Sequence, residues 1–561
     1  MIFSRSRRVW VACLPALLLV ATACQKTSQF KVGANDINPM PAGQLASGGT
    51  LNWPLSQLPD NYNFNSNVGS LGDEASLIYA VMPTLFNYNA LGQPVLDTDY
   101  LTKASVTSSS PQVVTYEINP QAKWSDGTPI TAADFIAQWK ALNGKDPTFN
   151  AASTAGYEDI SSVTQGTGAG EVLVSFTSPF SAWQGLFTPL YPAALNATSA
   201  TFNAGWVTGT VTSAGPFVMQ GIDHSVQTAT VVRNPAWWGT KPVLNSIVYH
   251  SVGTDASKEL AALRRGTIDF VQLPALKGPL TSARDIKGTT IRTAGGPQFR
   301  VLTLNAESPN LQDIKVRQAV GLAIDRQALA KAILGPLGVP DATLNNHIFM
   351  ADERGYQDNA GMFGTSDARR AGTLLDQAGF KLVKGVRTKN GQAMQLRMVI
   401  PSDNAAAAQE AGLIKKDLEG VGIKVQVQGV PAQTFFPSYV AAGDFDLTLY
   451  SQQGSTSPIV SSQSVYQNPL RGSNGAEAIG QNYARVGSPA LDQLIAQALA
   501  ELDPTRAITL GNRIDIMIWG EVHSLPLYEQ PQIVVQKSSL ANFGAFGFAN
   551  PDYQAIGFAK S

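Results

Sequence analysis

Histidine and cysteine are scarce in this 561-residue sequence, which limits the chemistry that the chain can perform. The four histidines share no metal-ligand spacing, and no thiol lies downstream of Cys24. His347 follows two asparagines, where a bond to a turn explains it better than a metal. The sequence has no Gly-x-Ser-x-Gly elbow and no Gly-x-x-x-x-Gly-Lys motif. We therefore expect no metal, no cofactor and no enzyme, although acidic pairs such as Asp73-Glu74 keep a hydrolase as an alternative.

Neutral polar side chains are the groups best placed to contact a ligand. Asn61, Tyr62 and Asn63 directly follow a predicted strand over residues 50–56. Ligands of α/β sheets collect outside the carboxyl ends of strands, so these side chains suit a neutral polar ligand. Turn geometry alone would also explain asparagines at this point, and both interpretations stay open.

The composition excludes several classes of partner. There are 40 Lys and Arg against 41 Asp and Glu, so the chain is not a basic nucleic-acid binder. Charged residues make up 14% of the chain, well below the roughly 25% of average soluble proteins. The exposed surface must therefore be polar but mostly uncharged, and the length corresponds to several folding units.

The first residues predict export and a lipid anchor. Three arginines precede an apolar run over residues 9–20, which is too short to stay in a membrane as a helix. Small residues then lead to Cys24, as in a lipoprotein cleavage site, although Ala21 stands where leucine is usual. We expect a signal peptide over 1–23, lipidation of Cys24 and a flexible tether over 24–48, with the export route left open.

The elements that position these groups alternate along the chain. A strand over 113–118 leads to a turn over 124–129, and Thr131 with Asp134 forms a capping box for a helix that buries Phe135. A strand, helix, strand unit covers 247–271, and a second region opens with a strand at 301–305. A long helix is expected over 489–519. This alternation predicts an α/β fold with a largely parallel sheet.

Several of these segments, in this order, resemble family 5 extracellular solute-binding proteins of ABC importers, the peptide and nickel group. The resemblance spans nearly all of residues 49–561. Stretches 344–347, 355–359 and 540–544 look closest to a branch of oligopeptide-binding lipoproteins. The segments that carry the family resemblance are 116–118, 124–135, 233–239, 316–319, 323–326, 443–447 and 525–528.

The resemblance implies a two-lobed clamp of the type II, cluster C kind. Lobe I would comprise residues 49–297, with an extra subdomain at about 86–204, and the return of the chain over 526–561. Lobe II would be the inserted segment 298–525. Closure of the two lobes would bury a ligand without any chemistry on it.

The resemblance also locates a site. The family commonly has Trp-x-x-Asp after the strand that here ends near Tyr450, and that Asp pairs with a peptide's α-ammonium. Gln452 and Ser455 stand at those two positions, and a serine hydroxyl cannot neutralise a charge. We therefore expect ligands whose polar groups are mainly neutral, such as blocked peptides or glycans. The expected site is completed by Gln453, Asn482, Tyr483 and main-chain atoms near Phe299.

The implied function is that of a monomeric, lipid-anchored receptor that captures oligopeptide-like solutes. Its partners would be an ABC permease and its ATPase subunits, with no nucleic acid and with membrane contact through the lipid only. A lipoprotein of the same fold that senses or regulates envelope metabolism, independently of transport, is the first alternative, and an extracellular hydrolase is the second.

Overall fold

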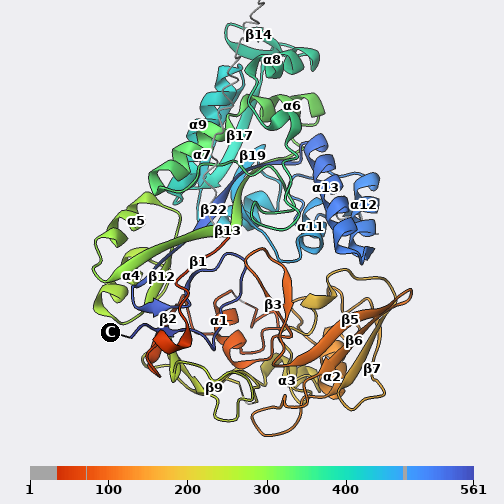
Figure 1. The fold of residues 1–561 in the computed structure, drawn as a ribbon. Coiled ribbons are helices and arrows are strands. Elements are labelled where there is room, and N and C mark those ends of the chain that lie inside the picture. The colour runs from red at the N-terminus through yellow and green to blue at the C-terminus, as the bar shows by residue number, and fades with distance from the viewer. Residues whose placement is uncertain (1–33, 71, 211, 472–476, 561) are drawn as a thin grey trace, which may run out of the picture. The chain divides into compact units, whose positions relative to one another are not determined.

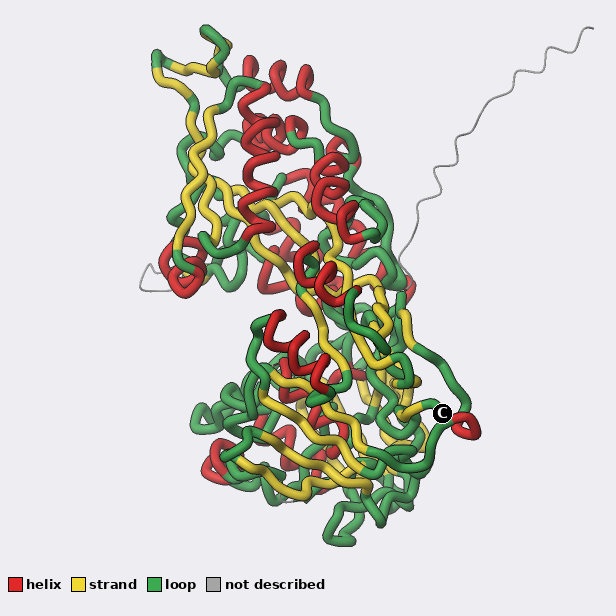
Figure 2. The backbone as a smooth tube through the Cα atoms, turned by 90° about the vertical axis from the view of Figure 1, so that its left-hand side faces the viewer, coloured by secondary structure: helices red, strands yellow, loops and turns green. Residues whose placement is uncertain are grey.

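The computed structural model describes residues 34–560 apart from 71, 211 and 472–476 (Figure 1). These residues form two lobes, and two long strands, β13 (Thr289–Leu304) and β22 (Ser524–Lys537), run between them (Figure 2). Each lobe has its own apolar core, one built around Trp53 and Tyr116 and the other around Leu302 and Leu525. The two-lobed α/β fold expected from the sequence is confirmed.

Lobe I is built on a four-stranded sheet in the order β2-β11-β10-β9. In β2 (Thr50–Leu55) the residues Leu51, Trp53 and Leu55 alternate inward, as the period of two requires. β2 runs parallel to β11 (Ser246–Ser251), and the other neighbours are antiparallel. The other elements of this sheet and its surroundings are α1 (Gly72–Val81), β3 (Phe86–Tyr88), β4 (Pro94–Leu96), η2 (Trp183–Gly185), α3 (Ser199–Ala204), β9 (Phe217–Asp223) and β10 (Thr228–Arg233).

A second sheet of lobe I lies inside the segment expected as an extra subdomain. It is antiparallel and has the order β5-β6-β8-β7, with α2 (Ala132–Leu142) packed against it (Figure 1). The predicted capping box is confirmed, because the Thr131 hydroxyl accepts from the Ala133 amide and the Asp134 carboxylate accepts from the Thr131 amide. The strands are β5 (Leu101–Ser109), β6 (Gln112–Ile118), β7 (Ile160–Gln165) and β8 (Glu171–Phe176).

Lobe II is built on a six-stranded sheet in the order β12-β22-β13-β19-β17-β18. Only β17 pairs in parallel, with β18 and with β19, so the expectation of a largely parallel sheet is wrong. The two interlobe strands lie side by side in opposite directions, and the alternating pattern of the sequence does not reveal this pairing. The remaining strands are β12 (Phe270–Leu273), β17 (Gln395–Pro401), β18 (Lys424–Val430) and β19 (Leu447–Gln453).

Helices cover this sheet, and their apolar faces share its core. Helices α4 and α5 and strand β12 contribute to the same core, although residues 256–286 fall within the segment assigned to lobe I from the sequence. The elements of this part of the chain are α4 (Ala256–Arg265), α5 (Lys277–Arg284), α6 (Ile314–Ala323), α7 (Arg326–Leu334), η3 (Gly335–Leu337), η4 (Gly361–Phe363), α8 (Ala368–Gln377), β14 (Lys381–Val383), β15 (Val386–Lys389), β16 (Gln392–Ala393), α9 (Ala405–Gly420), α10 (Ala432–Thr434) and the π-helix η5 (Phe435–Val440).

A separate helical layer of lobe II consists of α11 (Pro458–Tyr466), α12 (Pro489–Ala500) and α13 (Pro504–Glu521), with its own apolar cluster. The expectation of one helix over 489–519 is wrong. The first helix ends at Ala500, and Asp503 caps the second by accepting from the Arg506 amide. Pro504 at the first helical position cannot donate to the preceding turn, so the helix restarts there.

The two interlobe strands are interrupted where they leave lobe I. The register of β13 against β22 shifts between Ala294 and Gln298. A Cβ atom on Gly296 would lie 2.1 Å from the carbonyl oxygen of Gln530, so the close approach of the two backbones requires glycine. The lobe boundary expected at residues 297/298 lies next to this irregularity and stays a prediction.

The described part of the expected tether is folded. β1 (Asp36–Ile37) pairs with β24 (Gly544–Ala545), and Leu45 bridges to Ala559 near the C-terminus. Asp36 also forms an ion pair of 2.8 Å with Arg292 of β13. Residues 34–48 therefore lie along the body beside the interlobe strands, whereas Cys24 and the expected signal peptide lie outside the described residues. The remaining short elements are η1 (Ala42–Gln44), β20 (Leu470–Arg471), β21 (Glu477–Ala478), β23 (Leu540–Ala541) and β25 (Gly557–Phe558).

Candidate ligand-binding cavity

A cavity of about 570 Å³ lies between the two lobes. Most residues of the stretches 88–95 and 181–185 of lobe I line one side. On the lobe II side the lining consists of Phe349, Glu353 and Arg354, residues 456–460, and several residues between 501 and 508. A neighbouring cavity of about 290 Å³ shares Ala182, Gly185, Ser457 and Val460 with it. The volume of the larger cavity lies within the range of small-molecule sites, and its lining mixes apolar side chains with neutral amides and hydroxyls.

The wall from lobe I is the turn between β3 and β4. The Asn89 side-chain oxygen accepts from the amides of Leu91 and Gln93, which fixes the turn. Gly92 has a φ of 70°, a left-handed conformation that favours glycine. Tyr88 lies at the end of β3, and burial raises the pKa of its hydroxyl, while hydrogen bonding to the Thr456 and Ser457 side chains acts in the opposite direction.

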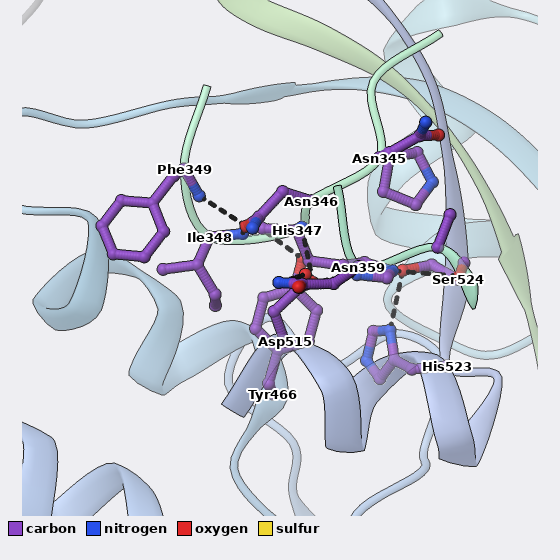
Figure 3. A network of polar contacts seen from close by, with 12 residues as sticks. Asn345, Asn346, His347, Ile348, Phe349, Asn359, Tyr466, Asp515, His523 and Ser524 are labelled. Carbon is purple, nitrogen blue, oxygen red and sulfur yellow. Dashed lines mark hydrogen bonds and ion pairs between the residues drawn. The ribbon is translucent and has the colours of Figure 1, made fainter. Parts of the chain in front are cut away.

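The wall from lobe II is a loop over residues 344–360, which a buried polar network holds in place (Figure 3). The Asn346 oxygen accepts from the amides of Ile348 and Phe349, both at 2.8 Å, so it sets the direction of the chain where Phe349 enters the cavity wall. The Asn346 amide donates to the Asn512 oxygen on α13. Helix α13 therefore positions this wall.

His347 is the centre of the same network. Its Nδ1 lies 2.7 Å from Asp515 Oδ1, and its Nε2 lies 3.1 Å from the carbonyl oxygen of Ser524 (Figure 3). The sequence favours a bond from His347 to a turn, whereas its partners lie on α13 and at the start of β22. In the described residues, no cluster of His, Cys, Asp and Glu side chains could hold a metal ion.

Backbone contacts join the lobes around the cavity. The Ser181 amide donates to the carbonyl oxygen of Leu499 at 2.9 Å. The Arg354 amide lies 3.4 Å from the carbonyl oxygen of Leu91, at another side of the cavity. These bonds exist only when the two walls face each other, so the structure represents an arrangement in which the lobes are in contact.

Asn61, Tyr62 and Asn63, which follow β2 and were expected to contact a ligand, are buried in lobe I. The side-chain amides of Asn61 and Asn63 donate to the carbonyl oxygens of Asn203 and Phe202. Tyr62 is buried in the lobe I core. The side chains of Asn61 and Asn63 therefore bond to the backbone of α3, and their contact with a ligand stays a prediction. Phe64 and Asn65, which directly follow them, line the smaller cavity.

The segment at the end of β19 reaches the cavity. Gln452 and Gln453 close the strand, and the Ser455 hydroxyl accepts from the Ser457 amide at 3.1 Å. Thr456 and Ser457, the next residues, line the cavity. Gln452, Gln453 and Ser455 are not among the residues that line the cavity, and their contact with a ligand stays a prediction.

The other expected residues lie deeper. Phe299 pairs with Gln452 on one side and Glu529 on the other, so its strand is flanked by neighbours at that point. Asn482 is buried and accepts from His523. The ring of Tyr483 packs against the rings of Phe436 and Tyr450.

Sequence reasoning missed the residues that dominate the lining, above all Tyr88, Phe349 and Glu353. The asparagine and glycine of the turn over 89–92 were a usable signal. Glu353 carries no such signal. It is 7% exposed, and burial, followed by the nearby Glu529, raises its pKa to about 8.

Residues 97–474 match bacterial extracellular solute-binding proteins, family 5 Middle, and the chain belongs to this family. It is 38% identical over 532 residues to the oligopeptide-binding protein OppA of Mycobacterium tuberculosis, covering 94% of this chain and 87% of the relative. An uncharacterized lipoprotein of the same organism is 27% identical over 519 residues, covering 85% and 87% of the two chains.

A solved structure of a periplasmic EDTA-binding protein, EppA, has the same architecture. Its TM-score is 0.82 at 26% identity, and the match covers 94% of this chain and 98% of the other. None of the helices in the described part of this chain has both the length and the apolar character needed to cross a membrane.

Proposed function

We propose that this chain captures oligopeptides or peptide-like solutes and delivers them, unaltered, to an ABC permease powered by its ATPase subunits. The observation that carries the proposal is the cavity lined by both lobes, because a ligand there is bound by both walls at once. The relation to OppA supports a peptide-like ligand. The closed arrangement is then the form that a permease can distinguish from the empty one.

The chemistry of the lining favours a ligand with neutral polar groups. Side chains such as Asn89, Gln93 and Thr456 offer hydrogen bonds without charge. Ser455, where the family resemblance implies an acid, carries no charge, and its hydroxyl accepts from the Ser457 amide. Peptide main-chain groups satisfy such a lining, and no fixed ammonium is needed.

The proposed molecule is a monomer without catalytic activity, held to the outer side of the cell membrane by a lipid on Cys24. The predicted signal over residues 1–23 and the lipoprotein relative support this anchor. Mass spectrometry of the protein from its own envelope would show a diacylated N-terminal cysteine at position 24. A chain that keeps residues 1–23, or an unmodified Cys24, would contradict the anchor.

Filling the cavity tests the function directly. Ala182 lines both cavities, so Ala182→Trp should weaken the binding of penta-alanine at least tenfold in calorimetry. Ala133→Trp, at an exposed position on α2, is the matched control and should bind like the unmodified protein. Circular dichroism checks that both variants fold. Equal binding by the folded Ala182→Trp variant would contradict the proposed site.

A further inference from the structure

Glu353 is an acid enclosed between the two lobes. It belongs to the loop that the His347 network holds, and it lines the cavity while only 7% exposed. From the opposite lobe, Gly92 covers it, since a Cβ atom on Gly92 would lie 3.2 Å from Glu353 Oε1. The absence of a side chain at Gly92 therefore leaves room for this carboxyl group.

The two carboxyl oxygens of Glu353 have different environments. Oε2 accepts from the Met350 amide at 2.7 Å. Among the described residues, Oε1 has no hydrogen-bond partner, and no Lys or Arg forms an ion pair with the carboxyl group. A carboxyl oxygen that lines a cavity and has no hydrogen-bond partner in the protein is available to a ligand.

The charged groups around Glu353 do not favour its ionised form. Glu529 of β22 and Asp352 of the same loop approach each other across Gly295, and the Glu529 Oε2 accepts from the Ala351 amide. Arg354 of the loop is exposed to solvent. Tyr88 faces the cavity from lobe I, and Glu501 on the far rim is paired with Arg506. Burial and a neighbouring acid thus act together, and the pKa of Glu353 is raised to about 8.

We propose that Glu353 is a specificity-determining residue that binds the ligand as a neutral carboxylic acid, with Oε1–H donating a hydrogen bond to an amide carbonyl oxygen of the ligand. Oε2 is the carbonyl-type oxygen of this acid, because it accepts from the Met350 amide. Every peptide unit offers the carbonyl acceptor that such a donor needs. A neutral donor also keeps the cavity free of an unpaired charge, in agreement with a ligand of neutral polar groups.

The inference about Glu353 rests on the proposed function. Three variants test the role of Glu353 separately from peptide binding itself. Glu353→Gln keeps the hydrogen-bond pattern of the neutral acid, since its amide oxygen can accept from the Met350 amide and its NH₂ group can donate into the cavity. Glu353→Ala removes the donor. Glu419→Gln, at an exposed position on α9, is the control.

Calorimetry with N-acetylated, amidated penta-alanine at pH 7 and pH 9 provides the first measurement. The unmodified protein and Glu419→Gln should lose about tenfold in affinity between these pH values, as expected for one group that titrates near pH 8. Glu353→Gln should bind like the unmodified protein at pH 7 and show no such loss. Glu353→Ala should bind at least tenfold more weakly at pH 7. A tenfold weaker Glu353→Gln at pH 7, or a pH-independent unmodified protein, would overturn the inference.

A measurement without ligand keeps the two proposals apart. Carbon-13 NMR of labelled glutamate side chains, with Glu353→Gln to assign the signal, should show a Glu353 carboxyl group that is protonated at pH 7. If no peptide binds at any pH while the carboxyl is protonated, the peptide function fails and the neutral acid stands. If the carboxyl is ionised at pH 7, the neutral acid fails whatever the protein binds.

Discussion

His347 Nδ1 and Asp515 Oδ1 lie 2.7 Å apart, and neither side chain is exposed. Asp515 Oδ1 also accepts from the His347 amide, and its Oδ2 accepts from the Asn359 side chain. One carboxyl group on α13 thus fixes both the start and the end of the loop that forms the lobe II wall. The cavity depends on a residue that does not line it.

Replacing this carboxyl group should destabilise the fold and loosen the wall. Asp515→Ala leaves buried donors of His347 and Asn359 unpaired, so the free energy of unfolding should fall by about 3 kcal/mol. Urea unfolding measures this loss, and calorimetry should show weaker peptide binding. Asp403→Ala, at an exposed position, should change neither quantity. An Asp515→Ala variant as stable as that control would show that the network carries little energy.

A carboxylate at position 455 should change ligand preference. If Ser455 faces the ligand's amine, Ser455→Asp supplies an opposite charge, and free-amine penta-alanine should bind about tenfold more tightly than before. N-acetylated peptide should not gain. Ser461→Asp, on the exposed face of α11, is the matched control. If the affinities measured by calorimetry do not change, Ser455 does not face the ligand's amine.

Glycine is required where the backbones of the two interlobe strands approach closely, at Gly296. Gly296→Ala would place a methyl group 2.1 Å from the Gln530 carbonyl oxygen, so one strand must move. We expect a loss of about 1–3 kcal/mol in urea unfolding, as for overpacking elsewhere. Gly278→Ala, in α5 with no atom within 4 Å of the new methyl group, should be neutral or slightly stabilising. If the two variants are equally stable, the close approach of β13 and β22 at Gly296 tolerates a side chain.

His523 should make stability depend on pH. Its ring is buried, and burial lowers its pKa from 6.5 to about 3. The unfolded chain therefore binds a proton below pH 6.5 that the native protein does not, and stability falls as the pH decreases toward 3. At pH 5 this amounts to about 2 kcal/mol.

His523→Gln should flatten this part of the profile, measured by urea unfolding between pH 7 and pH 5. His224→Gln, at an exposed position, should keep the decline of the unmodified protein. If His523→Gln declines as steeply as the unmodified protein, other groups cause the acid sensitivity.

Local signals in the sequence predicted local structure well. The cap formed by Thr131 and Asp134 and the strand predicted over residues 50–56 both depend on residues only a few positions apart in the chain. Strand pairing is different, because β13 and β22 meet across more than 200 residues of chain. Neither periodicity nor propensity specifies which distant strand becomes the neighbour.

The candidate site shows the same limit. Asn61 and Asn63 looked suited to a ligand, but amides suit a helix backbone equally well, and α3 supplies that backbone. No motif in the sequence marks Glu353 as a cavity residue, because its environment includes a glycine of the other lobe. Side chains acquire such environments only when the lobes meet, and a sequence read segment by segment does not contain that information.

The ion pair between Asp36 and Arg292 has a mechanical consequence. It ties Asp36, near the beginning of the described residues, to β13 just before the irregularity at Ala294 in the strands that join the lobes. A point near an axis sweeps the shortest arc. In the proposed receptor, in which the lobes close about the strands that join them, a chain attached at this point would move little during closure, and ligand capture would exert little pull on the proposed lipid anchor.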